Sequence, residues 1–258
     1  VEGENLTVDF LNAQGDQANL QTMVDQLAGQ NDLNFAIATP AAQALLNVDS
    51  ETPAVFTAVT DPVSAGLVDS LETPGGNMTG SIDATDVEGQ VEMLLKVVPE
   101  AKTVGIFYNS SEVNSEVQAK QAKEALEAAG KTVVIKTVTS TNDVQQVMTS
   151  LAGQVDAIYL PTDNTVASTA ATIGEILMDK KVPAIGSDEA YLEAVLFTYG
   201  VDYHAIGVQA GELAVEVLKG KDPADLAVKK PDTAAIAVNE EMAKALGIDS
   251  ASIEELNK

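Results

Sequence analysis

The sequence predicts an α/β fold made of two lobes, each built on a parallel sheet. Short apolar runs alternate with segments of helical periodicity along the 258 residues, and most of these runs are continuous rather than alternating. Strands that are covered on both faces give such continuous runs. The glycine-rich break TPGGNMTGS, at 73–81, divides the series and favours two smaller sheets over one broad sheet.

The individual elements follow from these patterns. Strands are predicted for LTVDFL (6–11), NFAIA (34–38), AVFTAV (54–59), MTGSI (78–82), TVGIFY (103–108), TVVIKTV (132–138), DAIYLP (156–161), PAIGS (183–187), LFTYG (196–200) and AAIAV (234–238). Amphipathic helices are predicted for 16–29, 85–98, 113–129, 143–152, 165–180 and 204–219. In the first of these, Leu20, Met23, Val24 and Leu27 form one apolar stripe.

Three passages of the chain between the two sheets are expected, near 73–81, 199–207 and 231–239. The boundaries drawn from them assign residues 1–82 plus 203–232 to lobe 1. They assign residues 83–202 plus 233–258 to lobe 2.

The charge and composition exclude several functions. There are 39 acidic and 14 basic residues, which gives a net charge of −25, and every basic residue is Lys. This charge repels phosphate and disfavours a nucleic-acid partner. Without Arg, an anionic ligand group must be held by backbone N–H groups, hydroxyls or Lys. The chain has no Cys and one His, so no metal site is expected.

The sequence gives little support for catalysis. It contains no phosphate-binding loop, no dinucleotide fingerprint and no G-x-S-x-G nucleophile elbow. His204, in YGVDYHAIG, is expected to be an exposed residue at the start of a helix. We therefore expect a protein that is not an enzyme and needs no cofactor.

Five strand-to-helix junctions carry Ser, Thr, Asp or Asn where the helix begins. They are IATPAAQAL (37–45), VTDPVSAGL (59–67), YNSSEVNSEV (108–117), LPTDNTVAST (160–169) and IGSDEAYLEA (185–194). Helix capping accounts for each one singly. Together they lie at the carboxyl ends of parallel strands, which is the edge where open α/β sheets bind ligands. Two such edges facing each other predict a ligand cleft between the lobes.

The residue types at this edge suit a zwitterion. Helix N-termini favour a carboxylate, and we expect Thr39, Thr60 and nearby backbone N–H groups to hold it. Either Asp163 or Asp188 is expected to meet an ammonium group, and plain capping stays the alternative for Asp163. Tyr108 and Tyr203 are expected to lie beside the cleft and to cover the side chain of the ligand. For each of these two tyrosines, a half-buried packing role is the alternative.

A resemblance to a known family sharpens these expectations. The stretches AIATPAAQALL, VFTAVTDPVSAGLV, VGIFYNSSEVNSEVQ, DAIYLPTDNTVAS and IGSDEAYLEAV resemble the substrate-binding proteins of ABC transporters, in the branch associated with tryptophan and other aromatic amino acids. The resemblance covers nearly the whole chain. It implies a type I periplasmic-binding fold, with two Rossmann-like lobes joined by three crossover strands and a ligand in the hinge cleft.

The resemblance also implies partners, a location and a ligand shell. The partners are a membrane permease and its ATPase, and the location is outside the cytoplasmic membrane of a bacterium, often as a lipoprotein. The implied ligand shell draws on Thr39, Ala41, Thr60, Asp61, Asn109, Ser110, Asp163, Asn164 and Asp188.

One departure from the family concerns the first lobe. Relatives carry a βα unit before the segment that begins here as VEGENLTVDF, so we expect the first βα unit of lobe 1 to be missing. Its loss would leave an unpaired strand edge and exposed apolar surface. The expected consequence is either a homodimer, in which a second copy fills the gap, or a reorganised lobe.

The leading hypothesis is a solute-binding protein that captures a small amino acid, such as tryptophan or phenylalanine, by hinge closure and delivers it to a permease. A ligand-sensing module of the same fold, acting with a receptor, is the alternative. A single-sheet α/β enzyme ranks third.

Overall fold

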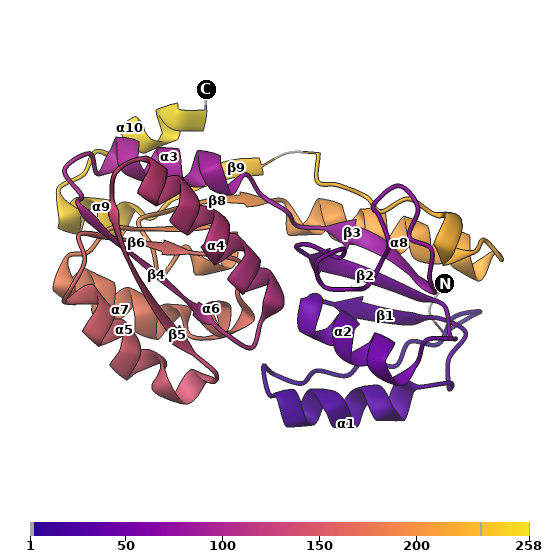
Figure 1. Cartoon of the computed structure of the whole chain (residues 1–258). Coiled ribbons are helices and arrows are strands. Elements are labelled where there is room, and N and C mark those ends of the chain that lie inside the picture. Colours follow the sequence, from indigo (N-terminus) through magenta and orange to yellow (C-terminus); the bar gives the residue numbers. More distant parts are fainter. Residues whose placement is uncertain (1–2, 233, 258) are drawn as a thin grey trace.

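The computed structural model describes residues 3–232 and 234–257. The chain forms two bodies, each with its own sheet and helices (Figure 1). Three stretches of chain run between the bodies. They follow β3 (Met78–Ile82), follow β8 (Phe197–Val201) and precede β9 (Ala234–Val238).

Lobe 1, the smaller body, is a parallel sheet of three strands in the order β1-β2-β3. Its other elements are β1 (Asn34–Ile37), β2 (Ala54–Val59), α1 (Gln17–Leu27), α2 (Thr39–Val48), α8 (Tyr203–Leu218) and η3 (Pro223–Asp225). One face packs on α8 around Val55 and Leu213. The other packs on α1 and α2 around Phe56 and Leu45. Burial on both faces explains the continuous apolar run AVFTAV.

Lobe 2 is a sheet of six strands in the order β5-β4-β6-β7-β8-β9, parallel except for β9, which runs antiparallel to β8. Its remaining strands are β4 (Thr103–Asn109), β5 (Thr132–Val138), β6 (Ala157–Leu160) and β7 (Ala184–Gly186). Its helices are α3 (Val87–Val97), α4 (Val113–Ala128), α5 (Val144–Ala152), α6 (Asn164–Ser168), α7 (Ala170–Lys180), α9 (Glu240–Leu246), α10 (Ser250–Glu254), η1 (Thr141–Asp143), η2 (Glu189–Tyr191) and η4 (Glu255–Asn257).

The larger core lies in lobe 2. The central strands place Ile106, Phe107, Ile158 and Tyr159 inside with no exposed surface. The helices α3 and α4 pack against each other, and so do α5 and α7. This core fixes the carboxyl ends of β4, β6 and β7, near which Asn109, Asp163 and Asp188 lie. The lobe boundaries drawn from the sequence at 82/83, 202/203 and 232/233 stay a prediction.

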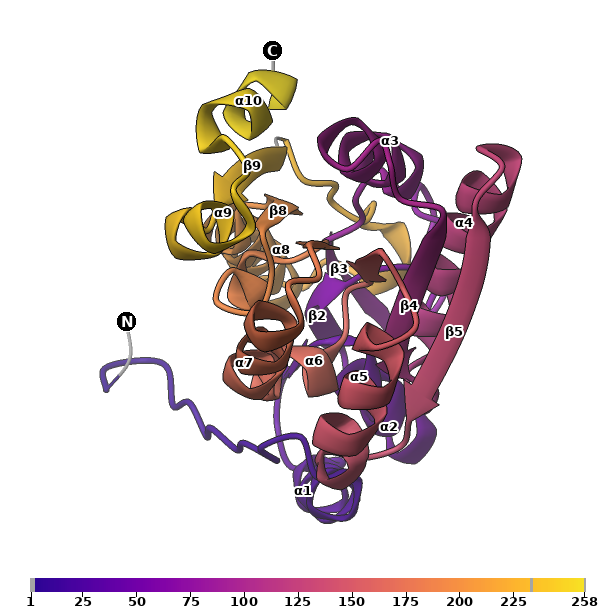
Figure 2. The ribbon, with the colours of Figure 1, turned by 90° about the vertical axis from the view of Figure 1, so that its left-hand side faces the viewer.

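The predicted strand at 6–11 is wrong. Leu6 forms only an isolated bridge, residues 7–12 form neither helix nor strand, and residues 3–12 are all exposed. Figure 2 shows this segment as a separate trace outside the packed body. A strand exists only where a neighbour completes its hydrogen-bond ladder, and the described part of the chain places no strand beside this segment. Its apolar side chains are left in solvent, with Val8 54% and Phe10 74% exposed.

Two of the predicted helix starts and one predicted helix are also wrong. The position of Thr39 directly before Pro40 predicts an N-cap. Thr39 is instead the first residue of α2, because Ala38, with φ of 76°, makes the turn into the helix. Residues 61–67 form turns instead of a helix, and Asp61 caps them by accepting from the N–H and hydroxyl of Ser64. The predicted helix 165–180 is two helices that meet at Thr169.

Among the helices of residues 3–232 and 234–257, none combines the length and the apolar character that crossing a membrane requires.

Candidate functional site: a cleft between the lobes

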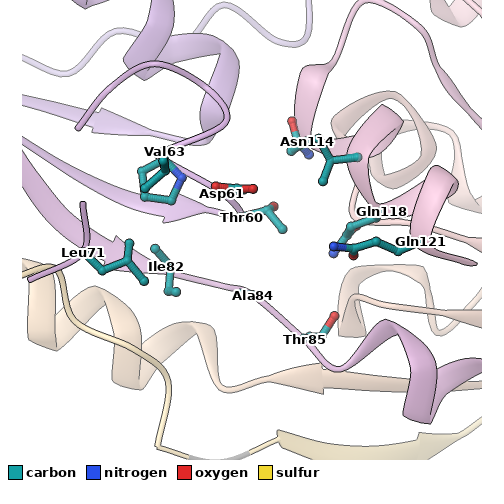
Figure 3. A pocket seen from close by; sticks show the side chains of 12 residues that line it. Thr60, Asp61, Val63, Leu71, Ile82, Ala84, Thr85, Asn114, Gln118 and Gln121 are labelled. Carbon is teal, nitrogen blue, oxygen red and sulfur yellow. The ribbon is translucent and has the colours of Figure 1, made fainter. Parts of the chain in front are cut away.

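A cavity of about 240 Å³ lies where the carboxyl ends of the lobe 1 strands face α4 of lobe 2 (Figure 3). Its size approaches the ~300–1,000 Å³ usual for small-molecule sites. The lining residues come from both lobes and from the passage after β3: Thr60, Asp61, Pro62, Val63, Leu71, Ile82, Ala84, Thr85, Asn114, Val117, Gln118 and Gln121. Any molecule in this cavity would contact both lobes at once.

The two walls of the cavity differ in character. The lobe 1 wall is mainly apolar, with Val63, Leu71 and Ile82 (Figure 3). The α4 wall is mainly polar, and the amide ends of Gln118 and Gln121 point from it toward lobe 1 (Figure 3). A cavity with one apolar and one polar wall suits a small amphipathic ligand.

Several polar atoms of the lining are buried without a hydrogen-bond partner. Among the described residues they include Asn114 Oδ1 and Gln118 Nε2. A buried polar atom that lacks a partner destabilises the fold by ~1–3 kcal/mol. These atoms have almost no accessible area, so they lie behind the cavity surface rather than on it.

The junction LPTDNTVAST holds α4 against β6 through the backbone of Thr162. The Thr162 carbonyl accepts from Asn114 Nδ2 at 2.8 Å and from Ser115 Oγ at 2.9 Å. The Thr162 N–H donates to Gln118 Oε1 at 2.7 Å. One residue of this junction therefore orients both amide side chains of the polar wall.

Asp163 sits beneath this wall and is 1% exposed. Its Oδ1 accepts from the N–H of Val166 at 2.9 Å and so caps α6, and its Oδ2 accepts from the N–H of Asn109 at 2.7 Å. Its own N–H donates to the hydroxyl of Tyr191. These contacts hold the end of β4 against the start of α6. Asp163 is therefore a helix cap, which is the alternative that the sequence left open for it.

Glu112, which the sequence did not single out, reaches the same helix start from the N-cap position of α4. It accepts from the N–H of Asn164 at 3.0 Å, from Asn164 Nδ2 at 2.7 Å and from the N–H of Thr165 at 3.3 Å. Burial, and the charge of Asp163 after it, raise the pKa of Glu112 to about 7. The two carboxyls therefore share less than two full negative charges near neutral pH.

A second buried acidic group lies where the chain passes between the lobes. The Tyr203 hydroxyl lies 2.8 Å from Asp188 Oδ2 and 3.1 Å from Asp83 Oδ2. Asp83 belongs to the passage after β3, and Tyr203 begins α8 after the passage from β8. This cluster ties two of the three inter-lobe passages to the end of β7, which places it at the hinge.

The hinge cluster disfavours full ionisation. Burial raises the pKa of Asp83 to about 6, the hydroxyls of Thr60 and Tyr203 lower it in part, and the charge of Asp188 raises it further. Burial also raises the pKa of Asp188. Since a phenol has one proton to donate, it cannot satisfy both carboxylates at once, and a proton on one of them completes the network.

Only some of the ligand-binding residues that the sequence predicts line the cavity. Thr60 and Asp61 line it. The others are not among its lining residues, and their contact with a ligand stays a prediction: Thr39, Ala41, Tyr108, Asn109, Ser110, Asp163, Asn164, Asp188 and Tyr203. Within this set Ser110 and Asn164 are exposed, whereas Ala41 and Tyr108 are half-buried.

Sequence reasoning missed the polar wall on α4. Asn114, Ser115 and Gln118 are all buried in this helix, at positions where a core-facing helix carries apolar residues. Asn114, Gln118 and Gln121 also recur at helical spacing, so they share one face. A polar stripe on the inner face of a helix that follows a strand end is the signal that could have located this wall.

Comparisons with known proteins agree with this architecture. Residues 1–255 match the family model for ABC transporter substrate binding proteins. The chain is 38% identical over 257 residues to a tyrosine-binding protein of Clostridioides difficile strain R20291, covering 99% of this chain and 74% of the relative.

Solved structures of substrate-binding proteins also resemble this chain. A domain from Streptococcus pneumoniae in complex with L-Trp aligns with a TM-score of 0.91 and 40% identity, over 97% of this chain and 88% of that one. The ligand-free, open structure of CD0873, a substrate-binding protein of Clostridium difficile, aligns with a TM-score of 0.70 and 42% identity, over 97% and 85%. These matches confirm the expected two-lobed α/β fold of the type I periplasmic-binding class. The chain belongs to the family of ABC transporter substrate-binding proteins.

Proposed function

We propose that the protein is the extracytoplasmic solute-binding component of an ABC importer and binds an aromatic amino acid in the cavity between its lobes. One observation carries this proposal: the cavity is lined from both lobes, with an apolar wall on lobe 1 and a polar wall on α4. The relatives support the ligand class, since one is named for tyrosine and another holds L-Trp.

The lining suggests how such a ligand is held. The aromatic ring packs on the apolar wall of Val63, Leu71 and Ile82. Asp61 is the carboxylate among the lining residues and meets the ammonium group. Because the chain has no Arg, the ligand carboxylate is held by hydroxyls and by backbone N–H groups.

Hinge closure is the proposed mechanism. The chain aligns better with the relative that holds L-Trp, at a TM-score of 0.91, than with the ligand-free, open relative, at 0.70, although the identities are nearly equal. This difference supports a family in which lobe orientation changes with ligand. A ligand that contacts both lobes stabilises the closed form, which the transporter then recognises.

The proposal extends to partners and location. The partners are a membrane permease and its ATPase, and a lipid anchor holds the protein at the outer face of the membrane. A second copy of the chain, as a homodimer, covers the free edge of β1. Phe35 and Ile37 lie exposed at that edge, by 42% and 56%, and an open strand edge is a template for another strand.

A thermal-shift screen of the twenty L-amino acids at pH 7 tests the ligand class. An aromatic amino acid should raise the melting temperature with dose, because a ligand that binds only the folded state stabilises it by mass action. Glycine and a neutral sugar serve as controls and should give no shift. A chain that responds to no amino acid, or to sugar alone, would contradict the proposed function.

A further inference from the structure

The hinge cluster of Asp83, Tyr203 and Asp188 contains a hydrogen bond that crosses from one lobe to the other. Tyr203 begins α8 of lobe 1, and its hydroxyl lies 2.8 Å from Oδ2 of Asp188, which follows β7 of lobe 2. The same hydroxyl lies 3.1 Å from Oδ2 of Asp83, in the passage after β3. A rotation of one lobe against the other would therefore change these distances.

The two carboxyls differ in how well they are held as anions. Asp188 Oδ1 accepts from the N–H of Ala190 at 2.8 Å, and Asp188 is 9% exposed. Asp83 is 2% exposed and faces the hydroxyls of Thr60 and Tyr203 and the carboxyl of Asp188. A hydrogen bond from a backbone N–H favours the ionised form, and deeper burial disfavours it. The proton of the pair therefore resides on Asp83.

The hydrogen bonds of the cluster depend on this proton. When Asp83 is neutral, its hydroxyl donates to the phenol oxygen of Tyr203, and the phenol donates to Asp188, so each contact contains one proton. When Asp83 is ionised, one phenol proton faces two carboxylates. One contact then has no proton, and two like charges lie on either side of one oxygen.

The described arrangement of the lobes is closer to that of a relative with ligand than to that of an open relative. The chain aligns at a TM-score of 0.91 with the domain that holds L-Trp and at 0.70 with ligand-free, open CD0873. In an open arrangement, separation of Tyr203 from Asp188 would admit water to both carboxyls, and each would ionise at its ordinary pKa. The two arrangements therefore bind different numbers of protons.

We propose that the hinge cluster is a proton-controlled latch, in which a proton on Asp83 stabilises the described arrangement of the lobes and its loss favours the open arrangement. The ligand cavity is lined from both lobes, so ligand binding is coupled to the same proton. This coupling to ligand rests on the proposed function, whereas the effect of pH on the arrangement of the lobes does not.

The direction of the pH effect follows from Asp83. Its pKa is about 6 in the described arrangement, against an ordinary value of 3.8 that applies once water reaches the carboxyl. The described arrangement therefore binds the extra proton between these values and loses its advantage as pH rises through about 6. The ratio of closed to open molecules should fall by ~10-fold from pH 5 to pH 7.5.

Other groups also titrate beside the cluster or the cavity. On η2 and at the start of α8 they are Glu189, Tyr191, Asp202 and His204. Burial raises the pKa of Glu112 to about 7, so the charge behind the polar wall changes in the same range. A variant of Asp83 is therefore needed beside a pH series.

Small-angle X-ray scattering of the ligand-free protein at pH 5 and pH 7.5 tests the latch. The radius of gyration of the wild type should be smaller at pH 5. Asp83→Asn replaces the protonated carboxyl with an amide that donates to Tyr203 at every pH, so it should keep the smaller radius at both. The matched control is Asp202→Asn, which removes the carboxyl that accepts from the N–H of Ala205 and should respond to pH as the wild type does.

Isothermal titration calorimetry with L-tryptophan, L-tyrosine and L-phenylalanine at the same two pH values measures the coupling to ligand. The carboxylate and ammonium groups of these amino acids keep their charges over this interval. The wild type should bind up to ~10-fold more tightly at pH 5 than at pH 7.5. Asp83→Asn should bind with the tighter affinity at both, and a gain of affinity at pH 7.5 cannot result from misfolding.

Tyr203→Phe keeps the latch testable if Asp83→Asn does not fold. It removes the shared hydroxyl and should give the larger radius and the weaker affinity at both pH values. A wild type in which neither radius nor affinity changes with pH, or a folded Asp83→Asn with the wild-type pH dependence, would overturn the latch. Absence of binding by all three amino acids would contradict the proposed function, while the radius of gyration still tests the latch.

Discussion

Buried carboxyls without cationic partners are the main electrostatic feature of individual residues. Asp83, Glu112, Asp163 and Asp188 are each at most 9% exposed and are held by backbone N–H groups, hydroxyls and amides. The ion pairs among the described residues join exposed side chains instead, such as Lys123 and Glu127. Exposed pairs contribute little to stability, so pH dependence should originate in the buried carboxyls.

Asp83 gives the clearest pH prediction. Its pKa is about 6 in the folded chain and 3.8 in the unfolded reference. Between these values the folded state binds the extra proton, so stability falls as pH rises from about 4 to about 6 and stays reduced above that. Asp83→Asn removes this penalty and should raise the free energy of unfolding at pH 8 by at most about 3 kcal/mol.

Urea unfolding of wild type and Asp83→Asn across pH 3.5 to 8 measures this effect. The free energies of unfolding of the two proteins should be similar near pH 3.5 and should diverge between about pH 4 and about pH 6. A difference in the free energy of unfolding that does not change with pH, or a variant that is less stable at pH 8, would contradict a destabilising ionised Asp83.

Asp61 is the carboxylate whose replacement should weaken ligand binding. It lines the cavity and is only partly buried, so a ligand ammonium can reach it. Asp61→Asn should weaken amino-acid binding by ~1.5–3 kcal/mol, the size of a charged hydrogen bond. Calorimetry on Asp61→Asn and Asp188→Asn compares the two carboxylates; if only Asp188→Asn loses affinity, the ammonium lies at the hinge instead.

At the level of elements, the junction between β6 and α6 supports the polar wall. Asp163 links the end of β4 to α6, and Thr162 orients the amides of α4. A short helix of this kind has little stability of its own. The geometry of the cavity therefore depends on hydrogen bonds made across three segments that are distant in sequence.

Asp163→Ala tests this support. It leaves the N–H groups of Asn109 and Val166 without their carboxylate acceptor, and should lower the free energy of unfolding by ~1–3 kcal/mol. Asp86→Ala, which removes an exposed cap of α3, is the matched control and should lose ~1 kcal/mol or less. Equal losses in the two variants would show that Asp163 is an ordinary cap.

The elements also show what sequence patterns can and cannot predict. Continuous apolar runs located nine strands, including the three-residue β7, because burial on both faces leaves a strong local signal. The segment 6–11 carries the same signal but forms no strand, since pairing depends on a neighbour elsewhere in the chain. Helix 165–180 was predicted whole because no local signal marks the break at Thr169.

The site was predictable only where it coincides with strand ends. Thr60 and Asp61 follow β2 directly, and both line the cavity, while their contact with a ligand stays a prediction. Asn114, Gln118 and Glu112 lie on or before α4, and their roles come from contacts to residues 44 or more positions away. No local pattern specifies such long-range pairing, so these contacts emerged only from the fold, whereas the polar stripe on α4 is a local signal for the wall itself.

For the whole molecule, two surface features act against each other. The net charge of −25 opposes self-association. The edge of β1, with Phe35 and Ile37, and the segment containing Phe10 expose apolar surface that favours it. Since salt screens the charge and not the apolar contact, the proposed homodimer should be stronger at higher ionic strength.

Sedimentation velocity at rising protein concentration, at 20 mM and 500 mM salt, tests this homodimer. A dimer should grow with both concentration and salt, and Ile37→Lys, which places a charge on the open edge, should suppress it. A wild-type chain that stays monomeric at every concentration and salt would contradict the proposal.

Simultaneous contact with both lobes is the claim on which the proposed function depends. Small-angle X-ray scattering, without ligand and with the amino acid that gives the largest thermal shift at saturation, tests it most directly. The radius of gyration should decrease on binding, because a ligand held by Asp61 of lobe 1 and Gln121 of lobe 2 draws the lobes together. A saturated protein whose radius of gyration is unchanged, with scattering that matches the ligand-free form, would contradict hinge closure.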